Sequence, residues 1–404
     1  MQRVKPLDEL TPADLWREVP ESEDEFWRDT RERQLRLLKG LLEGALEEEL
    51  TVLLGAGRYR RVEGRHGYRN GFYQRDLATQ VGIVTAIRVP RARDRVGEPS
   101  RARRSVFSRY QRRQAQVNQV IRETFLAGVS TRRVGETLEA LLGERVSAQT
   151  VSRVTRSLDR EVERFHDRAI SDDVRYLLLD GVYLRVKGAH TARRKLVLCA
   201  YGITVTGERR LLDFRLATTE SQAQWEAFLS SLRERGLLGR LLKLIVSDGC
   251  KGLHAALDTV YPYVPRQHCW VHKLRNVAAH LKRSQQEECM AGARTIYQSQ
   301  TRRAAVQAYW NWARRWRGEA PRAVACLERD LEPLLSFLAS PTSHRRMVRT
   351  TNAIERCFRE VRRRTRPMSC FNNAASCERI IYAVFSHLNR NWQGNPLPQF
   401  THNS

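Results

Sequence analysis

The apolar positions of the chain follow two spacings, and the change between them divides the sequence into segments. In the first 50 residues leucines recur every three to four positions, which predicts a helix with one apolar face. From Val81 to Val89 apolar residues alternate with others until Pro90, which predicts a strand. The pattern therefore predicts an acidic helical region over 1–56 and a small basic β element over 57–110.

The helical spacing returns over 111–170, where we expect a helical hairpin. Ser130 can cap a first helix that Gly143 ends, and Ser147 can cap a second helix. Two short helices around a glycine-containing turn are typical of helix-turn-helix proteins, whose second helix enters the major groove. On that interpretation the second helix presents three polar side chains to DNA: Gln149, Arg153 and Arg156. The alternative is an ordinary helical hairpin.

The central segment, 171–270, contains short apolar runs that predict a mixed sheet built from hairpins and helices. We expect strands in four of these runs: Tyr176–Leu179, Lys195–Ile203, Leu211–Leu216 and Leu241–Ser247. A helix from Ser221 to Leu232 precedes the last run. The segment 271–343 has a wholly helical pattern, and 344–404 contains a basic helix over 350–366 and an amphipathic helix over 374–392. The fold class is therefore multidomain α/β.

The charge of the chain indicates its partner. The 404 residues include 71 Lys and Arg against 45 Asp and Glu, a formal net charge of +26 with a pI of about 10.5. Such an excess favours a polyanion such as DNA, bound with an affinity that falls steeply with salt. No apolar run approaches the roughly 20 residues that span a bilayer, and no secretory signal is visible. We expect no membrane partner and a cytoplasmic, nucleoid-associated protein whose eight cysteines stay reduced.

Two of the predicted strands lead into an aspartate followed by a glycine, Asp180-Gly181 and Asp248-Gly249. Because glycine lets the backbone turn away, we expect both carboxylates at strand ends on the rim of the sheet. One Asp-Gly is weak evidence, since the pair is common in turns. Two of them, with a third acid on an arginine-rich helix, predict a shared metal site. Phosphodiester chemistry uses two divalent cations about 3.5–4 Å apart, and Mg²⁺ prefers carboxylate oxygens.

The basic helix offers two candidates for the third acid. Glu355 shares a helix face with Arg359 and Arg362, beside a buried stripe of apolar residues. Glu360 aligns instead with another group of arginines: Arg356, Arg363 and Arg364. Periodicity favours Glu355 only mildly, because Glu360 is equally suited to a solvated ion pair.

At this point the chain resembles a known family, the bacterial Mutator-type insertion-sequence transposases. The likeness covers roughly residues 50–392 and rests on these motifs: Tyr68-Arg69-Asn70-Gly71 with Val89-Pro90-Arg91, Val146-Ser147 with Val151-Ser152-Arg153, Leu179-Asp180-Gly181-Val182-Tyr183, Ser247-Asp248-Gly249, Cys269-Trp270-Val271-His272, and Thr351-Asn352-Ala353-Ile354-Glu355 with Val361-Arg362-Arg363-Arg364-Thr365.

The resemblance implies a DDE transposase with an RNase H-like core that an all-α insertion interrupts. It implies Asp180, Asp248 and Glu355 as the catalytic and metal-binding triad, with two Mg²⁺ or Mn²⁺ ions as cofactors. The implied partners are the terminal inverted repeats of the element, target DNA and further copies of the chain, in a homodimer or larger oligomer. We further expect three arginines of the basic helix to bind DNA: Arg359, Arg362 and Arg363.

Other functions remain as alternatives. A structure-selective nuclease would use the same core, whereas a non-catalytic DNA-binding regulator would need only the helical hairpin. Cys269 and His272 have half the ligand spacing of a zinc site, and packing or DNA contact is the other interpretation. His272 and Arg275 also fit the HxxR of tyrosine recombinases, yet the next suitable nucleophile, Tyr382, lies 107 residues beyond Arg275.

Overall fold

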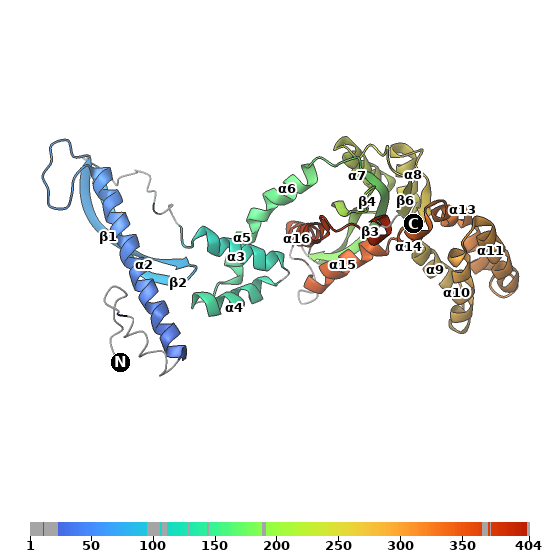
Figure 1. Ribbon diagram of the computed structural model, residues 1–404, viewed down its shortest axis with the longest axis horizontal. Coiled ribbons are helices and arrows are strands. Elements are labelled where there is room, and N and C mark those ends of the chain that lie inside the picture. The colour runs from blue at the N-terminus through green and yellow to red at the C-terminus, as the bar shows by residue number, and fades with distance from the viewer. Residues whose placement is uncertain are drawn as a thin grey trace. The chain divides into compact units, whose positions relative to one another are not determined.

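The computed structural model describes residues 23–94, 111–127, 129–143, 145–187, 191–365 and 373–401, together with Thr11, Val106 and Phe371. The chain divides into two compact units (Figure 1). The first comprises Met1–Phe125 and Val129–Arg156, and the second comprises Leu126–Gly128 and Ser157–Ser404. Cys370 and the side chain of Arg364 lie outside the described part of the chain.

In the first unit a long helix packs on a β-hairpin. The helix is α2 (Glu23–Leu54), and the hairpin pairs β1 (Gly67–Thr79) with β2 (Gly82–Asp94) in antiparallel fashion. The leucines predicted to form one stripe do so. Leu46 is buried against strand residues, and three more leucines of α2 pack at the edge of the same cluster: Leu35, Leu38 and Leu42.

The same unit contains the predicted helical hairpin. The hairpin is formed by α4 (Thr131–Leu142) and α5 (Ala148–Thr155), and α3 (Ala115–Leu126) precedes it. Ser130 accepts a hydrogen bond from the N–H of Arg133, Gly143 ends α4 with a φ of 78°, and Ser147 accepts from the N–H of Thr150. The predicted caps are therefore confirmed.

The second unit is built on a five-stranded mixed sheet with the order β5-β4-β3-β6-β7. Its strands are β3 (Val174–Lys187), β4 (Ala192–Thr204), β5 (Arg209–Ala217), β6 (Leu244–Ser247) and β7 (Arg266–His268). The first three form an antiparallel meander, whereas β6 pairs in parallel with β3, and β7 pairs in parallel with β6. The predicted mixed sheet is confirmed.

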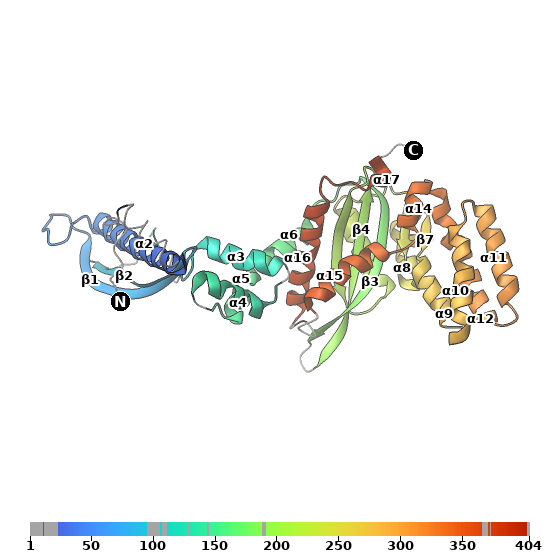
Figure 2. The same ribbon diagram turned by 60° about the horizontal axis from the view of Figure 1, so that its bottom comes forward.

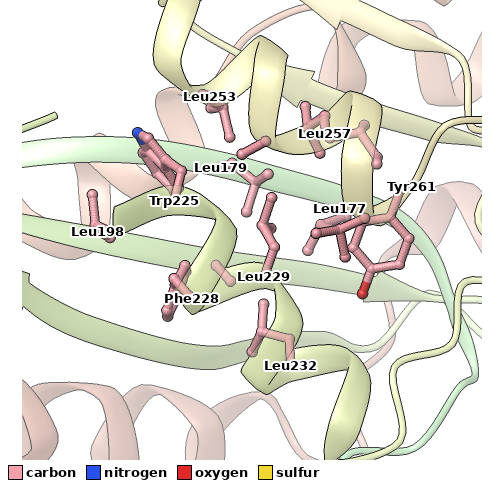
Figure 3. Close-up of a cluster of buried hydrophobic side chains, with 14 of the residues drawn as sticks. Leu177, Leu179, Leu198, Trp225, Phe228, Leu229, Leu232, Leu253, Leu257 and Tyr261 are labelled. Carbon is pink, nitrogen blue, oxygen red and sulfur yellow. The ribbon is translucent and has the colours of Figure 1, made fainter. Parts of the chain in front are cut away.

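Helices cover both faces of this sheet. On one face, α7 (Gln222–Glu234) and α8 (Lys251–Val260) bury an apolar cluster against the strands (Figure 3). On the other face lie α15 (Asn352–Thr365) and α16 (Ala374–Trp392), which contact β3 and β5 (Figures 1 and 2). Because side chains alternate along a strand, Leu177 and Leu179 point to α7 and α8, while Asp180 points to the face of α15.

The segment between β7 and α15 is helical, as the sequence predicts. It contains α9 (Trp270–Ala278), α10 (Arg283–Gln298), α11 (Arg302–Trp316), α12 (Pro321–Glu328), α13 (Leu331–Leu335) and α14 (Thr342–Val348). Trp312 and Trp316 are buried in its core, whereas Trp310 is about half exposed. Within the residues described, no helix has the length and apolar character that a membrane span requires.

Candidate active site

Asp180 lies in the middle of β3 and not at a strand end, so the sequence prediction was wrong on this point. Beyond it, β3 continues to Lys187 while paired with β4, and Asp180 itself faces Cys199 across that pair. The parallel neighbour β6, in contrast, stops at Ser247. The carboxylate therefore lies where the parallel half of the sheet ends, since the antiparallel meander alone carries β3 further.

The register of the parallel strands aligns the two aspartates. Leu178 is paired with Val246, and the same offset two residues later brings Asp180 level with Asp248. Asp248 follows β6 directly, as predicted, and Gly249 turns the backbone with a φ of 86°. The N–H of Cys250 donates to the Oδ1 of Asp248 over 3.0 Å and closes this turn.

The third acid comes from α15, whose apolar stripe is buried as predicted: Ile354, Phe358 and Val361 are all fully covered. With this stripe buried, Glu355 lies near enough to the aspartates for its charge to raise the pKa of Asp180. Arg275 of α9 lies 3.8 Å from the Oε1 of Glu355. Glu360 points elsewhere and forms an ion pair of 2.9 Å with Arg363.

The electrostatics of Asp180 reflect its burial among other acids. Its side chain is 4% exposed. Burial, together with the charges of Asp248 and Glu355, raises the pKa of Asp180 to about 7, although the charge of His272 and a hydrogen bond from Thr351 act to lower it. Carboxylates crowded in this way repel each other unless a cation lies among them.

Cys269 and His272 form a polar pair beside the acids. Hydrogen bonding to Cys269 raises the pKa of His272 to about 9, with Asp180 and Asp248 contributing. Burial opposes the thiolate form of Cys269, but hydrogen bonds from His272 and Thr351 lower its pKa. A protonated imidazole is no metal ligand. The one group of three metal-ligand side chains found among the described residues contains neither of them, and it contains neither Asp180 nor Glu355.

That group contains a residue that the sequence interpretation missed, Glu220. Its carboxylate, one carboxylate oxygen of Asp248 and the thiol of Cys250 all lie within 4.8 Å of one another. Glu220 belongs to the short connection between β5 and α7, directly before the capping Ser221. An acid just before a helix is common on any surface, so no local pattern could have indicated it.

The residues predicted to bind DNA are on the surface. Gln149, Arg153 and Arg156 are exposed on α5 or just after it, in the first unit. The second unit exposes three arginines on α15: Arg359, Arg362 and Arg363. The recombinase alternative has no support, because the hydroxyl of Tyr382 donates to Glu161 at 3.2 Å, on the helices α16 and α6 (Asp159–Asp167).

Comparison with known proteins shows the family to which this basic chain belongs. The family described as transposase, Mutator family, matches residues 18–395. The chain belongs to this family. It is 35% identical to the transposase for insertion sequence element ISRM5 of Rhizobium meliloti, over 88% of this chain and 87% of that one.

The chain is also similar to a second relative and to a solved structure. The transposase for IS256 in transposon Tn4001 of Staphylococcus aureus is 32% identical, over 86% of this chain and 87% of its own length. Among solved structures, the Drosophila P element transposase strand transfer complex covers 72% of this chain and 82% of its own, with a TM-score of 0.31 and 12% identity.

Proposed function

We propose that the protein is the DDE transposase of an insertion sequence. It binds the terminal inverted repeats of its element, cuts DNA with metal-activated water and joins the freed 3′-hydroxyl to target DNA. Its catalytic and metal-binding residues are Asp180, Asp248 and Glu355. The observation that carries this proposal is that Asp180 and Asp248 are level at the end of the parallel strands, with Glu355 of α15 near enough for its charge to raise the pKa of Asp180.

The donor set suits divalent cations. The three side chains offer oxygen ligands, which Mg²⁺ and Mn²⁺ prefer. Two such cations activate the attacking oxygen and stabilise the leaving oxygen of a phosphodiester. Asp180 is buried and crowded by like charge, which a bound cation would relieve. The side chains of Asp180 and Asp248 hold their positions through the sheet, and Glu355 holds its position through the buried stripe of α15.

The arginines of α15 have a separate task in this proposal. Arg359 and Arg362 follow Glu355 by four and seven residues, so they share its helix face. Guanidinium groups bind phosphate oxygens in a bidentate manner, and they would hold the DNA backbone beside the acids. Arg363 extends this basic surface while it pairs with Glu360.

The arrangement of the second unit supports an RNase H-like core with an all-α insertion. Three antiparallel strands are followed by two parallel ones, and the first acid lies on the central strand β3 while the second directly follows its neighbour β6. The helices α9 to α14 separate the last strand from α15, which brings the third acid back to the sheet. In this proposal α5 reads the element ends, and two or more copies of the chain act together on DNA.

A strand-transfer assay tests the proposed function. The purified chain is incubated with a labelled duplex carrying one element end, a plasmid target and Mg²⁺. Joined products that disappear with EDTA are expected. Cleavage without joining would instead support the structure-selective nuclease, and binding without cleavage in either Mg²⁺ or Mn²⁺ would support the regulator.

A further inference from the structure

We infer that Glu220 is a fourth carboxylate of the metal centre, and that it acts together with Asp248. This inference rests on the proposed function and extends its ligand set. Glu220 reaches the centre from the α7 face of the sheet, whereas Asp180 and Glu355 reach it from the α15 face. Asp248 therefore has acids on both sides. In this arrangement two cations would share the carboxylate of Asp248, and each would have a further acid as a ligand.

Two glycines make room for Glu220. A Cβ added to Gly181 would lie 2.8 Å from the Oε1 of Glu220, so the carboxylate occupies the space that any side chain at 181 would fill. A Cβ added to Gly252 would lie 2.9 Å from the backbone oxygen of Glu220, and 3.0 Å from the N of Gln222. The backbone of the connection before α7 thus packs closely against the first turn of α8, and the carboxylate of Glu220 lies beside Gly181 of β3.

Two donors orient the carboxylate, one partly buried and one fully buried. The thiol of Cys250 accepts from the N–H of Leu253 at the start of α8, and its own S–H hydrogen-bonds to Glu220. Trp225 is fully buried, and its indole N–H has no hydrogen-bond partner of good geometry. This N–H points to Glu220 and lowers the pKa of that carboxyl. Figure 3 shows that indole nitrogen turned away from the apolar cluster. A buried N–H aimed at a carboxylate is typical of an acid whose position matters.

The charge around Glu220 completes the argument. Burial raises the pKa of Glu220, and the charge of Asp248 raises it further, while hydrogen bonds from Cys250 and Trp225 and the charge of His272 lower it. No lysine or arginine is among the groups that act on this carboxylate. His272 is the cationic side chain that acts on this carboxylate, and a divalent cation with oxygen ligands would balance the negative charge that Glu220 and Asp248 share.

The test compares Glu220→Gln with Glu234→Gln, an exposed acid at the end of α7, the helix that follows Glu220. Mn²⁺ binding to the full-length protein without DNA is measured by titration calorimetry, and Mg²⁺-dependent strand cleavage is measured alongside. Glu220→Gln is expected to weaken Mn²⁺ binding about 10- to 100-fold and to slow cleavage, while Glu234→Gln matches the wild type. Equal Mn²⁺ binding by the two variants would overturn the inference.

Two further variants keep the result decisive. If Glu220→Gln does not fold, Glu220→Asp retains the charge on a shorter side chain, and it is expected to bind Mn²⁺ with intermediate affinity. Unchanged affinity there would count against the inference. Asp180→Asn separates the inference from the proposed function. Cleavage by Asp180→Asn would refute the proposed function. Loss of cleavage in Asp180→Asn, together with unchanged Mn²⁺ binding and cleavage in Glu220→Gln, would refute only the role of Glu220.

Discussion

The thiol of Cys269 accepts hydrogen bonds from both the backbone N–H and the hydroxyl of Thr351, at 3.3 and 3.5 Å. The two residues are 82 positions apart in the chain. Cys269 directly follows β7, and Thr351 directly precedes α15. This contact ties the helix that carries Glu355 to the edge of the sheet near Asp248, and it closes the loop made by the helices α9 to α14.

Replacing Thr351 by Val tests this connection. The change keeps the backbone N–H but removes a buried hydroxyl that reaches both Cys269 and Asp180, so we expect a loss of about 1 kcal/mol in the free energy of unfolding. We also expect slower strand cleavage, because Glu355 is held less firmly. Urea unfolding and a cleavage time course measure the two effects. Thr350→Val is the control, and a rate equal to that control would contradict the proposed link.

The three acids of the proposed site are tested by Asp180→Asn, Asp248→Asn and Glu355→Gln. Each is expected to abolish strand cleavage while affinity for the element ends stays within about twofold, because a metal ligand matters chiefly in the transition state. Glu360→Gln is the matched control on α15. Full cleavage by Glu355→Gln together with loss of cleavage in Glu360→Gln would show that the third acid is Glu360 and not Glu355. Gel-shift and cleavage assays on the same preparations distinguish these results.

Arg153→Ala and Arg156→Ala test the role of α5. If these arginines reach base edges, each replacement should cost about 1–3 kcal/mol in discrimination between an element end and unrelated DNA. Fluorescence anisotropy with both duplexes gives the two affinities. Equal losses on both would reduce α5 to a phosphate-contacting or structural helix. Ser147→Ala, which removes the cap of α5, shows how much loss follows from a weakened helix alone.

Arg359→Ala tests the basic face beside Glu355. The expected result is weaker DNA binding with a salt slope reduced by about 1, because one phosphate contact is lost. Arg303→Ala, an exposed arginine of the distant helix α11, is the control (Figure 2). A lower melting temperature without DNA and an unchanged salt slope would show that Arg359 stabilises the fold instead.

Asp213→Asn is expected to lower the free energy of unfolding by about 3 kcal/mol, since it removes the buried charge that pairs with the largely buried guanidinium of Arg235. Asp213 is 1% exposed, lies 2.7 Å from His166 and forms an ion pair with Arg235. Asp258→Asn breaks a pair with Arg266 on the surface and should change stability by less than about 1 kcal/mol. Chemical denaturation of both variants checks the difference.

Local patterns predicted much of the fold. The caps at Ser130, Gly143 and Ser147, and the final helix over 374–392, agree with the structure because each depends on neighbours within a few residues. Periodicity also identified the buried stripe of α15. It could not separate Glu355 from Glu360 decisively, since which face meets the sheet depends on packing with distant strands.

The errors and omissions came from contacts between distant segments. Gly181 looks like a turn residue beside Asp180, yet it lies within β3 and is small because Glu220 occupies the adjacent space. Nothing near Glu220 in the sequence reveals a partner 39 residues away. The strand β7 is three residues long and mostly polar, so its own sequence does not predict a strand. Its parallel pairing with β6 makes it one.

The order of the elements along the chain sets when activity can arise during synthesis. The helix α5 ends about 200 residues before Glu355, so at the usual rate of translation roughly 10 to 40 s pass between the two. A growing chain, or one truncated before Asn352, can already present the helix proposed to hold element ends while it lacks the third acid. Such a fragment would occupy the ends without cutting them, and prematurely terminated chains would act as inhibitors of the complete protein.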